Sequence, residues 1–197
     1  MSEIRSILIA YPEEFACYSK FKRKIDFYTS NTGEMELICF EDANDFIKKY
    51  SEEKGCNLTV YPSETSALKA ATHAILFDDR NCYEDLRQSL KDSEKPTRVI
   101  KLQLTIVVNK DRDEPYDIYI GRGTIWGNPY QMGQDGDRDE VIRKFEYDFQ
   151  RGFLKASENF EKNISMLKGK VIACHCKPAA CHGDVIAHFI NSQDDGE

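Results

Sequence analysis

The sequence predicts an α/β fold, in which a Rossmann-like parallel sheet with helices on both faces is followed by a smaller, closely packed α+β domain. Short apolar runs alternate with amphipathic segments over residues 1–103, as is typical of a parallel sheet covered by helices. Residues 104–191 lose this alternation and carry two segments rich in glycine, cysteine and histidine. A hydrophobic content of 41% over 197 residues is enough to bury a core in each part.

The N-terminal part contains five apolar runs of strand length, separated by segments with the apolar period of a helix. The expected strands are residues 7–10, 35–40, 58–61, 74–77 and 99–104. The expected helices are residues 15–28, 43–54, 66–72 and 83–93. Gly55 is a suitable residue to end the second helix. Right-handed crossovers between parallel strands would make this domain Rossmann-like.

The C-terminal part begins with a β-branched run at residues 105–108. A polar turn at 109–114 and a returning strand at 116–120 are expected next. A glycine-rich loop follows at 121–136, then a long helical stretch at 139–167 that bends near Gly152. A strand at 170–176 and a closing helix at 181–191 complete the pattern. The predicted domains are therefore 1–103 and 104–191, and residues 192–197 are expected to form a flexible tail.

The charge distribution argues against a nucleic-acid duplex as partner. The net charge is −7, and the halves 1–102 and 103–197 carry −3 and −4. Neither half has the basic excess that is typical of duplex binding. No apolar run resembles a signal peptide or a membrane span. We therefore expect a cytoplasmic protein, in the host cytoplasm if a phage encodes it, that binds neither duplexes nor membranes.

The seven cysteines are an odd number, which in a cytosolic chain argues against a disulfide framework. Four are scattered and are expected to be packed thiols: Cys17, Cys39, Cys56 and Cys82. The other three lie close together in the sequence, at Cys174, Cys176 and Cys181. This cluster indicates a site, although packing remains the favoured interpretation for Cys174.

The segment Gly121-Arg122-Gly123-Thr124-Ile125-Trp126-Gly127-Asn128-Pro129 is the first candidate site. Its glycines permit positive φ or a close approach of backbones. Arg122 offers a planar fork of donors that suits phosphate or carboxylate. Trp126 offers a ring on which a base could stack, and Asn128 presents an amide. The alternative is an ordinary glycine loop with Trp126 in the core.

The segment Cys174-His175-Cys176-Lys177-Pro178-Ala179-Ala180-Cys181-His182-Gly183-Asp184 is the second candidate site. A helix that begins near Cys181 would offer free N–H groups and a positive dipole end, which attract anions and favour a thiolate nucleophile. Lys177 would add charge. Asp184 either stabilises the first turn or acts as an acid/base. His182 acts as an acid/base, a hydroxyl ligand or a packed imidazole.

Three cysteines and one histidine of the second segment are also candidate metal ligands: Cys174, Cys176, Cys181 and His182. Their C-x-C-x4-C-H spacing differs from the usual zinc patterns, because adjacent ligands such as Cys181 and His182 rarely point to one centre. We therefore expect neither a metal nor another cofactor. A zinc-stabilised interaction module remains the alternative.

Residues 35–79 resemble the SLOG superfamily of Rossmann-like nucleotide proteins. Gly55, Val60-Tyr61-Pro62 and Ala74-Ile75-Leu76-Phe77 fit the family's order of elements. Cys39-Phe40-Glu41-Asp42-Ala43-Asn44-Asp45 stands in place of the family's glycine turn, and this departure removes the phosphate-binding glycines. The resemblance implies a Rossmann-like domain that supports the second half, without the family's active site.

Residues 105–190 resemble the family named domain of unknown function 4326, found in bacteria and phages. The motifs that carry the resemblance are the two candidate segments together with Thr105-Ile106-Val107-Val108-Asn109-Lys110, Tyr119-Ile120, Asp139-Glu140-Val141-Ile142 and Gly169-Lys170-Val171. The family often has an aromatic residue where His175 stands, so His175 is not expected to be essential. The resemblance implies a site but names no reaction.

Together the motifs predict a site for a small nucleotide or nucleoside derivative. As an enzyme, the protein would be a hydrolase or glycosyl transferase acting on an N-glycosidic bond, with Asp184 and His182 as catalytic residues. The alternative is a non-catalytic phage-type protein that sequesters a nucleotide signal. The residues expected to bind the ligand are Gly121, Arg122, Gly123, Trp126, Asn128, Cys176, Lys177 and Cys181. The sequence leaves open whether the protein is an enzyme and whether it forms a homo-oligomer.

Overall fold

The structure, a computed structural model, describes residues 4–196, so residues 1–3 of the predicted first domain and the last residue of the predicted tail lie outside the described residues. The chain divides into two compact units. Unit 1 is Met1–Leu102 with Asp194–Glu197, and unit 2 is Gln103–Gln193. Within residues 4–196, no helix combines the length and apolar character needed to cross a membrane.

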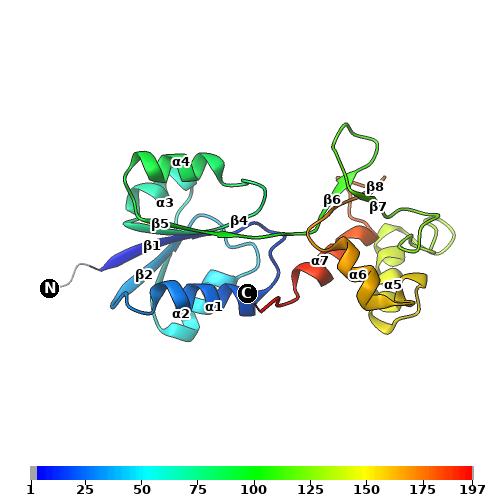
Figure 1. The fold of residues 1–197 in the computed structure, drawn as a ribbon, viewed down its shortest axis with the longest axis horizontal. Helices are drawn as coiled ribbons and strands as arrows, with labels where there is room; N and C mark the ends of the chain where they lie inside the picture. The colour runs from blue at the N-terminus through cyan, green and yellow to red at the C-terminus, as the bar shows by residue number, and fades with distance from the viewer. Residues whose placement is uncertain (1–3, 197) are drawn as a thin grey trace. The chain divides into compact units, whose positions relative to one another are not determined.

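Unit 1 is built on a five-stranded parallel sheet with the strand order β3-β2-β1-β4-β5. The strands are β1 (Arg5–Ala10), β2 (Met35–Cys39), β3 (Asn57–Val60), β4 (His73–Asp78) and β5 (Thr97–Lys101). The helices are α1 (Tyr18–Thr29), α2 (Phe46–Lys54), α3 (Glu64–Ala70) and α4 (Glu84–Asp92). Figure 1 shows α1 and α2 on one face of this sheet and α3 and α4 on the other. The predicted α/β fold class is thus confirmed.

The central strand β1 explains why its sequence is apolar without alternation. Side chains of a strand point alternately to the two faces of the sheet. Leu8 and Ala10 pack in one cluster with Leu86 and Leu90 of α4. Ile9 is equally buried, on a strand that helices cover on both faces. A strand covered on both faces therefore has no polar side, which is why the run from residue 7 to residue 10 is continuous.

The turn after β2 differs from a phosphate-binding loop in a specific way. The Asp42 carboxylate accepts hydrogen bonds from the backbone N–H groups of Ile47 and Lys48, at 3.1 and 2.9 Å. These groups lie at the start of α2, and the free N–H groups of a helix start can bind an anion. Tyr11 also donates its hydroxyl to Asp42. The chain's own carboxylate therefore occupies the anion position of this helix.

Unit 2 contains a three-stranded parallel sheet with the order β6-β8-β7. Its strands are β6 (Ile106–Asn109), β7 (Ile118–Tyr119) and β8 (Val171–Cys174). Residues 116–120 were expected to return after a turn, but β6 and β7 form no hairpin, because both strands pair in parallel with β8 and flank it. The polar segment between β6 and β7 is therefore a crossover past β8. The apolar pattern marked the strands but carried no information on their partners.

The helices of unit 2 are α5 (Arg138–Arg151), the 3-10 helix η1 (Lys155–Ser157), α6 (Phe160–Leu167) and α7 (His182–Asn191). The stretch predicted as one bent helix is interrupted, because Gly152 adopts φ 73° and ends α5. Figure 1 shows α5, α6 and α7 on the same side of the sheet. Their buried faces meet a core that includes Ile120, Phe145, Ile172 and Ile186.

Residues near the C-terminus form ion pairs with α1. In the segment predicted to be a flexible tail, the Asp194 carboxylate lies 2.8 Å from the Arg23 guanidinium, and Asp195 pairs with Lys20. Both basic residues belong to α1, which explains why this segment groups with unit 1.

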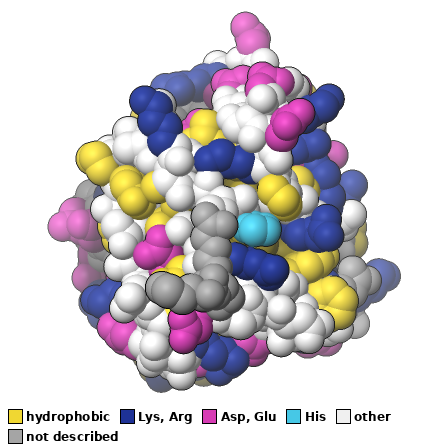
Figure 2. All heavy atoms as spheres, turned by 90° about the vertical axis from the view of Figure 1, so that its left-hand side faces the viewer, with side chains coloured by type: hydrophobic (Ala, Val, Ile, Leu, Met, Phe, Trp, Pro, Cys, Tyr) yellow, Lys and Arg dark blue, Asp and Glu magenta, His cyan; other side chains and the backbone are white. Residues whose placement is uncertain are grey.

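On the face shown in Figure 2, basic, acidic and hydrophobic side chains are interspersed.

Candidate functional site

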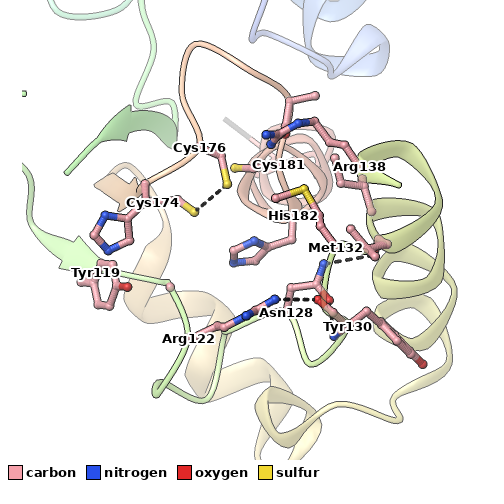
Figure 3. Close-up of a pocket in the computed structure, with 15 residues that line it drawn as sticks. Tyr119, Arg122, Asn128, Tyr130, Met132, Arg138, Cys174, Cys176, Cys181 and His182 are labelled. Atoms are coloured by element: carbon pink, nitrogen blue, oxygen red, sulfur yellow. Dashed lines mark hydrogen bonds between the residues drawn. The ribbon is translucent and has the colours of Figure 1, made fainter. Parts of the chain in front are cut away.

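A cavity of about 380 Å³ lies within unit 2. Four segments meet around it: the loop after β7, the start of α5, the end of β8 with the turn that follows, and the start of α7 (Figure 3). The lining residues are Tyr119, Gly121, Arg122, Asn128, Tyr130, Met132, Arg138, Val141, Ile142, Cys174, His175, Cys176, Ala180, Cys181 and His182. The two candidate segments of the sequence therefore meet at one cavity.

The glycine loop is a compact turn that fixes the position of Arg122. A Cβ atom on Gly127 would lie 2.8 Å from the Gly121 carbonyl oxygen and 2.9 Å from the Arg122 Cα. Because both neighbours are backbone atoms, no side-chain rotation could make room for it. Gly123 has a φ of 92°, a conformation that favours glycine. The sequence-based expectation of close backbone approach therefore fits Gly127, and that of positive φ fits Gly123.

Asn128 connects this loop to α5. Its side-chain amide donates to the Val141 carbonyl at 3.0 Å, and its amide oxygen accepts from the Tyr130 backbone N–H at 2.9 Å. The side chain is 9% exposed. Both polar ends are thus used within the fold. Asn128 lines the cavity and positions the loop at the same time.

Two guanidinium groups line the cavity. Arg122 donates to the Tyr130 carbonyl at 3.0 Å, and Arg138 donates to the Ala180 carbonyl at 3.0 Å. Within residues 4–196, neither guanidinium forms an ion pair with a carboxylate. Each guanidinium has five N–H donors and a permanent charge. This wall of the cavity is therefore suited to an anionic group.

The side chains of Cys174, Cys176, Cys181 and His182 lie opposite Arg122 in the view of Figure 3. The Cys174 and Cys176 sulfurs are 3.7 Å apart. The candidate ligand atoms of Cys174, Cys181 and His182 all lie within 4.8 Å of one another. Cys174, Cys181 and His182 are buried, so this polar cluster forms the inner wall of the cavity.

The titration of the three thiols is linked. The hydrogen bond between Cys181 and Cys174, with a further contribution from His182, lowers the pKa of the Cys174 thiol well below its ordinary value. The same bond, together with burial, raises the pKa of Cys181. Burial and the neighbouring Cys174 raise the pKa of Cys176. The cluster therefore favours negative charge on Cys174 while its two neighbours keep their protons.

Asp184 does not line the cavity. Its carboxylate accepts from the Cys181 backbone N–H at 2.8 Å and lies 2.5 Å from the Lys177 ammonium. This geometry matches the reciprocal bond of a capping box at the start of α7. Lys177 is likewise outside the lining and paired with Asp184. The helix-stabilising alternative therefore describes Asp184 better than the acid/base alternative.

Trp126 lies in the core of unit 2 and is 6% exposed. It does not line the cavity, and Gly123 does not line it either. A buried indole offers no face to a ligand, so the core alternative describes Trp126. The aromatic side chains at the cavity are those of Tyr119 and Tyr130.

Two family models match the chain, one in each half. The family model described as Minimal SLOG domain matches residues 4–108. The model described as Domain of unknown function (DUF4326) matches residues 106–192. The chain belongs to the Minimal SLOG domain family, whose model covers more than half of it, and residues 106–192 match the DUF4326 model. Both resemblances predicted from the sequence are confirmed, and we refer to the matched segments as the SLOG domain and the DUF4326 domain.

One curated relative resembles the DUF4326 domain. It is the uncharacterized 12.4 kDa protein in the nrdA-td intergenic region of Enterobacteria phage T4, which is 42% identical over 90 residues. The match covers 45% of this chain and 80% of the relative. No solved structure matches the chain. SLOG membership indicates nucleotide-related binding, while the DUF4326 domain carries the cavity.

Sequence reasoning missed Arg138, Tyr130 and Met132 as lining residues. For Arg138 a signal existed. It is the first residue of α5, directly after the capping residue Asp137. A cation is unfavourable beside the positive end of a helix dipole. An arginine at this position therefore indicates a role other than helix stability.

Proposed function

We propose that the cavity of the DUF4326 domain binds a small nucleotide or nucleoside derivative that carries an anionic group. The observation that carries the proposal is the presence of two guanidinium groups, Arg122 and Arg138, in one largely apolar cavity. The volume of about 380 Å³ falls within the range of about 300–1,000 Å³ of small-molecule sites. The nucleotide-related character of the SLOG family supports the choice of ligand class.

The wall chemistry suits such a molecule. Arginine forks bind phosphate through two parallel hydrogen bonds, which fix its orientation as well as its charge. Met132, Val141 and Ile142 provide apolar contacts, and Tyr119 and Tyr130 provide aromatic rings. A sugar or base could rest on these side chains while the phosphate meets the arginines. The combination favours a phosphorylated nucleoside over a free nucleoside.

Within this proposal, binding is favoured over cleavage of an N-glycosidic bond. Glycosidic cleavage commonly uses carboxyl groups as acid, base or nucleophile. Among the described lining residues there is no Asp or Glu. A non-catalytic protein that sequesters a nucleotide is therefore our first choice. Processing by a hydrolase or glycosyl transferase is the second, supported by the His182 imidazole in the cavity wall.

The experiment is to incubate the full chain with nucleoside monophosphates, cyclic nucleotides, NAD, ADP-ribose and the matching nucleosides. Binding is followed by calorimetry, and the ligand is then released by denaturation and identified by mass spectrometry. We expect a phosphorylated ligand to bind and to return intact. A chemically altered ligand would instead support the processing alternative. Absence of binding across the panel would refute the proposal.

Two variants test the assignment of the anion contacts. A hydrogen bond to a charged group contributes about 1.5–3 kcal/mol, so Arg122→Ala and Arg138→Ala should each weaken binding by roughly 10–100-fold. Arg112→Ala is the matched control, because Arg112 belongs to the same domain and lies outside the lining. Equal losses in all three variants would indicate nonspecific electrostatic attraction and would contradict the assignment.

A further inference from the structure

We infer that Cys174, Cys176, Cys181 and His182 bind one zinc ion at the inner wall of the cavity. Zinc binding here would not depend on the identity of the ligand proposed above. The observation behind it is one juxtaposition at the end of β8 and the start of α7: ligand atoms of Cys174, Cys181 and His182 lie within 4.8 Å of one another, and the Cys176 sulfur lies 3.7 Å from that of Cys174 (Figure 3). Sulfur and imidazole nitrogen are the ligands of tetrahedral zinc sites.

The spacing of the sulfur atoms fits a tetrahedral centre. Zinc–sulfur bonds are about 2.3 Å long, so two sulfur ligands on a tetrahedral ion lie about 3.8 Å apart. The Cys174 and Cys176 sulfurs are 3.7 Å apart. The ligand atoms of Cys174, Cys181 and His182 lie within 4.8 Å of one another, and the Cys176 sulfur, which contacts Cys174, would move toward the other two to complete the set.

The His182 ring is oriented as a metal ligand would be. Its Nε2 lies 2.9 Å from the Ile120 carbonyl oxygen, inside the fold. A carbonyl oxygen only accepts, so Nε2 carries the proton and Nδ1 of the neutral ring keeps its lone pair. Metal-binding histidines usually donate their second nitrogen to a carbonyl or carboxylate, which fixes the ring and its tautomer. Nδ1 is therefore the expected ligand atom.

The backbone explains how the adjacent residues Cys181 and His182 reach one centre, which sequence spacing alone argued against. Cys181 is the N-cap of α7 and has an extended conformation, with φ −151° and ψ 170°. His182 is the first helical residue. The change from extended to helical backbone at this point removes the alternation that would send neighbouring side chains to opposite sides. Both side chains accordingly line the cavity.

The cysteines of unit 1 differ from those of the DUF4326 domain in their surroundings. Cys17, Cys39, Cys56 and Cys82 lie in unit 1, and none belongs to a cluster of metal-binding groups found within residues 4–196. In the DUF4326 domain, Cys174 and Cys181 instead form such a cluster with His182, and the Cys176 sulfur contacts that of Cys174. With four protein ligands the site would be closed, which is the form of a structural zinc site. It would join the end of β8 to the start of α7.

Zinc binding would give His182 a structural role. As a zinc ligand, His182 would use the lone pair that an acid/base residue needs for proton transfer. Its contribution would then be to hold the cavity wall in place. Of the two arginines that we assign to anion binding, Arg122 is outside the cysteine cluster, whereas Arg138 hydrogen-bonds to the Cys176 side chain. Zinc content and nucleotide affinity are measured separately, so either proposal can fail without the other.

The test begins with the full chain, expressed without added metal and purified under reducing conditions without chelators. Elemental analysis is expected to find one zinc per chain. After removal of the metal, Co²⁺ should restore an intense thiolate-to-cobalt absorption band and the visible bands of tetrahedral cobalt. Zinc should protect three thiols from a thiol reagent. Absence of stoichiometric zinc, together with absence of a cobalt spectrum, would overturn the inference.

Variants then assign the ligands. Loss of a residue that only orients a metal ligand weakens metal binding about 10–100-fold. Loss of a ligand itself should cost more, so zinc affinity should fall by more than about 100-fold in Cys174→Ser, Cys181→Ser and His182→Ala. Cys176→Ser should likewise lower zinc affinity by more than about 100-fold, and it should weaken the cobalt–thiolate absorption band. Cys56→Ser is the matched control and should retain full zinc content. Wild-type zinc affinity in Cys176→Ser would overturn the four-ligand assignment. Should a variant fail to fold, the thiol-protection measurement on the wild-type chain still decides the inference.

Discussion

Replacement of Asp184 tests whether this residue stabilises α7 or takes part in chemistry. Its carboxylate accepts from the Cys181 N–H at 2.8 Å and pairs with Lys177 at 2.5 Å. Loss of a capping bond costs about 0.5–2 kcal/mol. The ion pair adds about 0.2–1 kcal/mol, because both side chains are about one-third exposed and solvent screens them. Asp184→Ala should therefore destabilise unit 2 by about 1–3 kcal/mol.

For a domain of this size, 1 kcal/mol corresponds to about 4–8 °C in Tm, so the expected fall is roughly 5–20 °C. Asp184→Asn should lower Tm by less, because its amide oxygen can still accept a hydrogen bond from the Cys181 backbone N–H. Asp139→Ala is the control. Asp139 is exposed in the first turn of α5, and its acid contributes through the helix dipole alone, about 0.3–1 kcal/mol.

Calorimetry measures the change in Tm, and hydrogen exchange over residues 181–191 shows whether α7 loses protection. Ligand affinity, measured with the panel described above, should stay within a few-fold of wild type because Asp184 lies outside the lining. An unchanged Tm combined with lost binding or lost turnover would refute the structural role and restore the catalytic one.

Two other changes test the loop and the first unit. Gly127→Ala should cost about 1–3 kcal/mol in calorimetry and weaken nucleotide binding, because the added Cβ would press on the backbone of Arg122; wild-type affinity would contradict the role assigned to this loop. Asp78 is fully buried; burial raises its pKa, but the Lys101 ammonium and the hydrogen bonds to its carboxylate outweigh burial and hold the pKa below its usual value. Its contribution to stability is therefore present above about pH 4, the range of the unfolded carboxyl, and is lost as the pH falls further. Asp78→Asn should lower stability by about 1–3 kcal/mol at neutral pH and flatten this acid dependence in denaturant titrations, whereas a slope equal to that of the exposed control Asp92→Asn would contradict the assignment.

The fold of unit 1 was predictable because each of its buried strands is a short, continuous apolar run. Helix starts were less predictable. The first helix was expected to include Phe15, but α1 begins at Tyr18. Phe15 instead donates its backbone N–H to the Pro12 carbonyl in a turn, and its ring packs against Phe77 at 5.2 Å. An aromatic residue contacts the core from a turn as well as from a helix, so the helical period alone could not place the boundary.

The candidate site was predictable as a location but only in part as a set of residues. Arg122, Cys181 and His182 line the cavity as expected. Trp126 looked like a stacking platform, because a sequence does not tell whether an indole faces a ligand or the core. Arg138 was missed because it lies outside the two segments and reaches the cavity only through the packing of α5.

The strand order β6-β8-β7 has a consequence for the synthesis of this domain. The central strand β8 is the last of the three to leave the ribosome. Ile106 and Ile118 can therefore pair with β8 only after it has been synthesised. Until then β6 and β7 expose unpaired backbone on their inner edges, which is a hazard for aggregation. A chain stopped before Val171 would hold every helix of the DUF4326 domain except α7 but no sheet at all. The sheet of this domain would thus form only after β8, which ends at Cys174, has been synthesised.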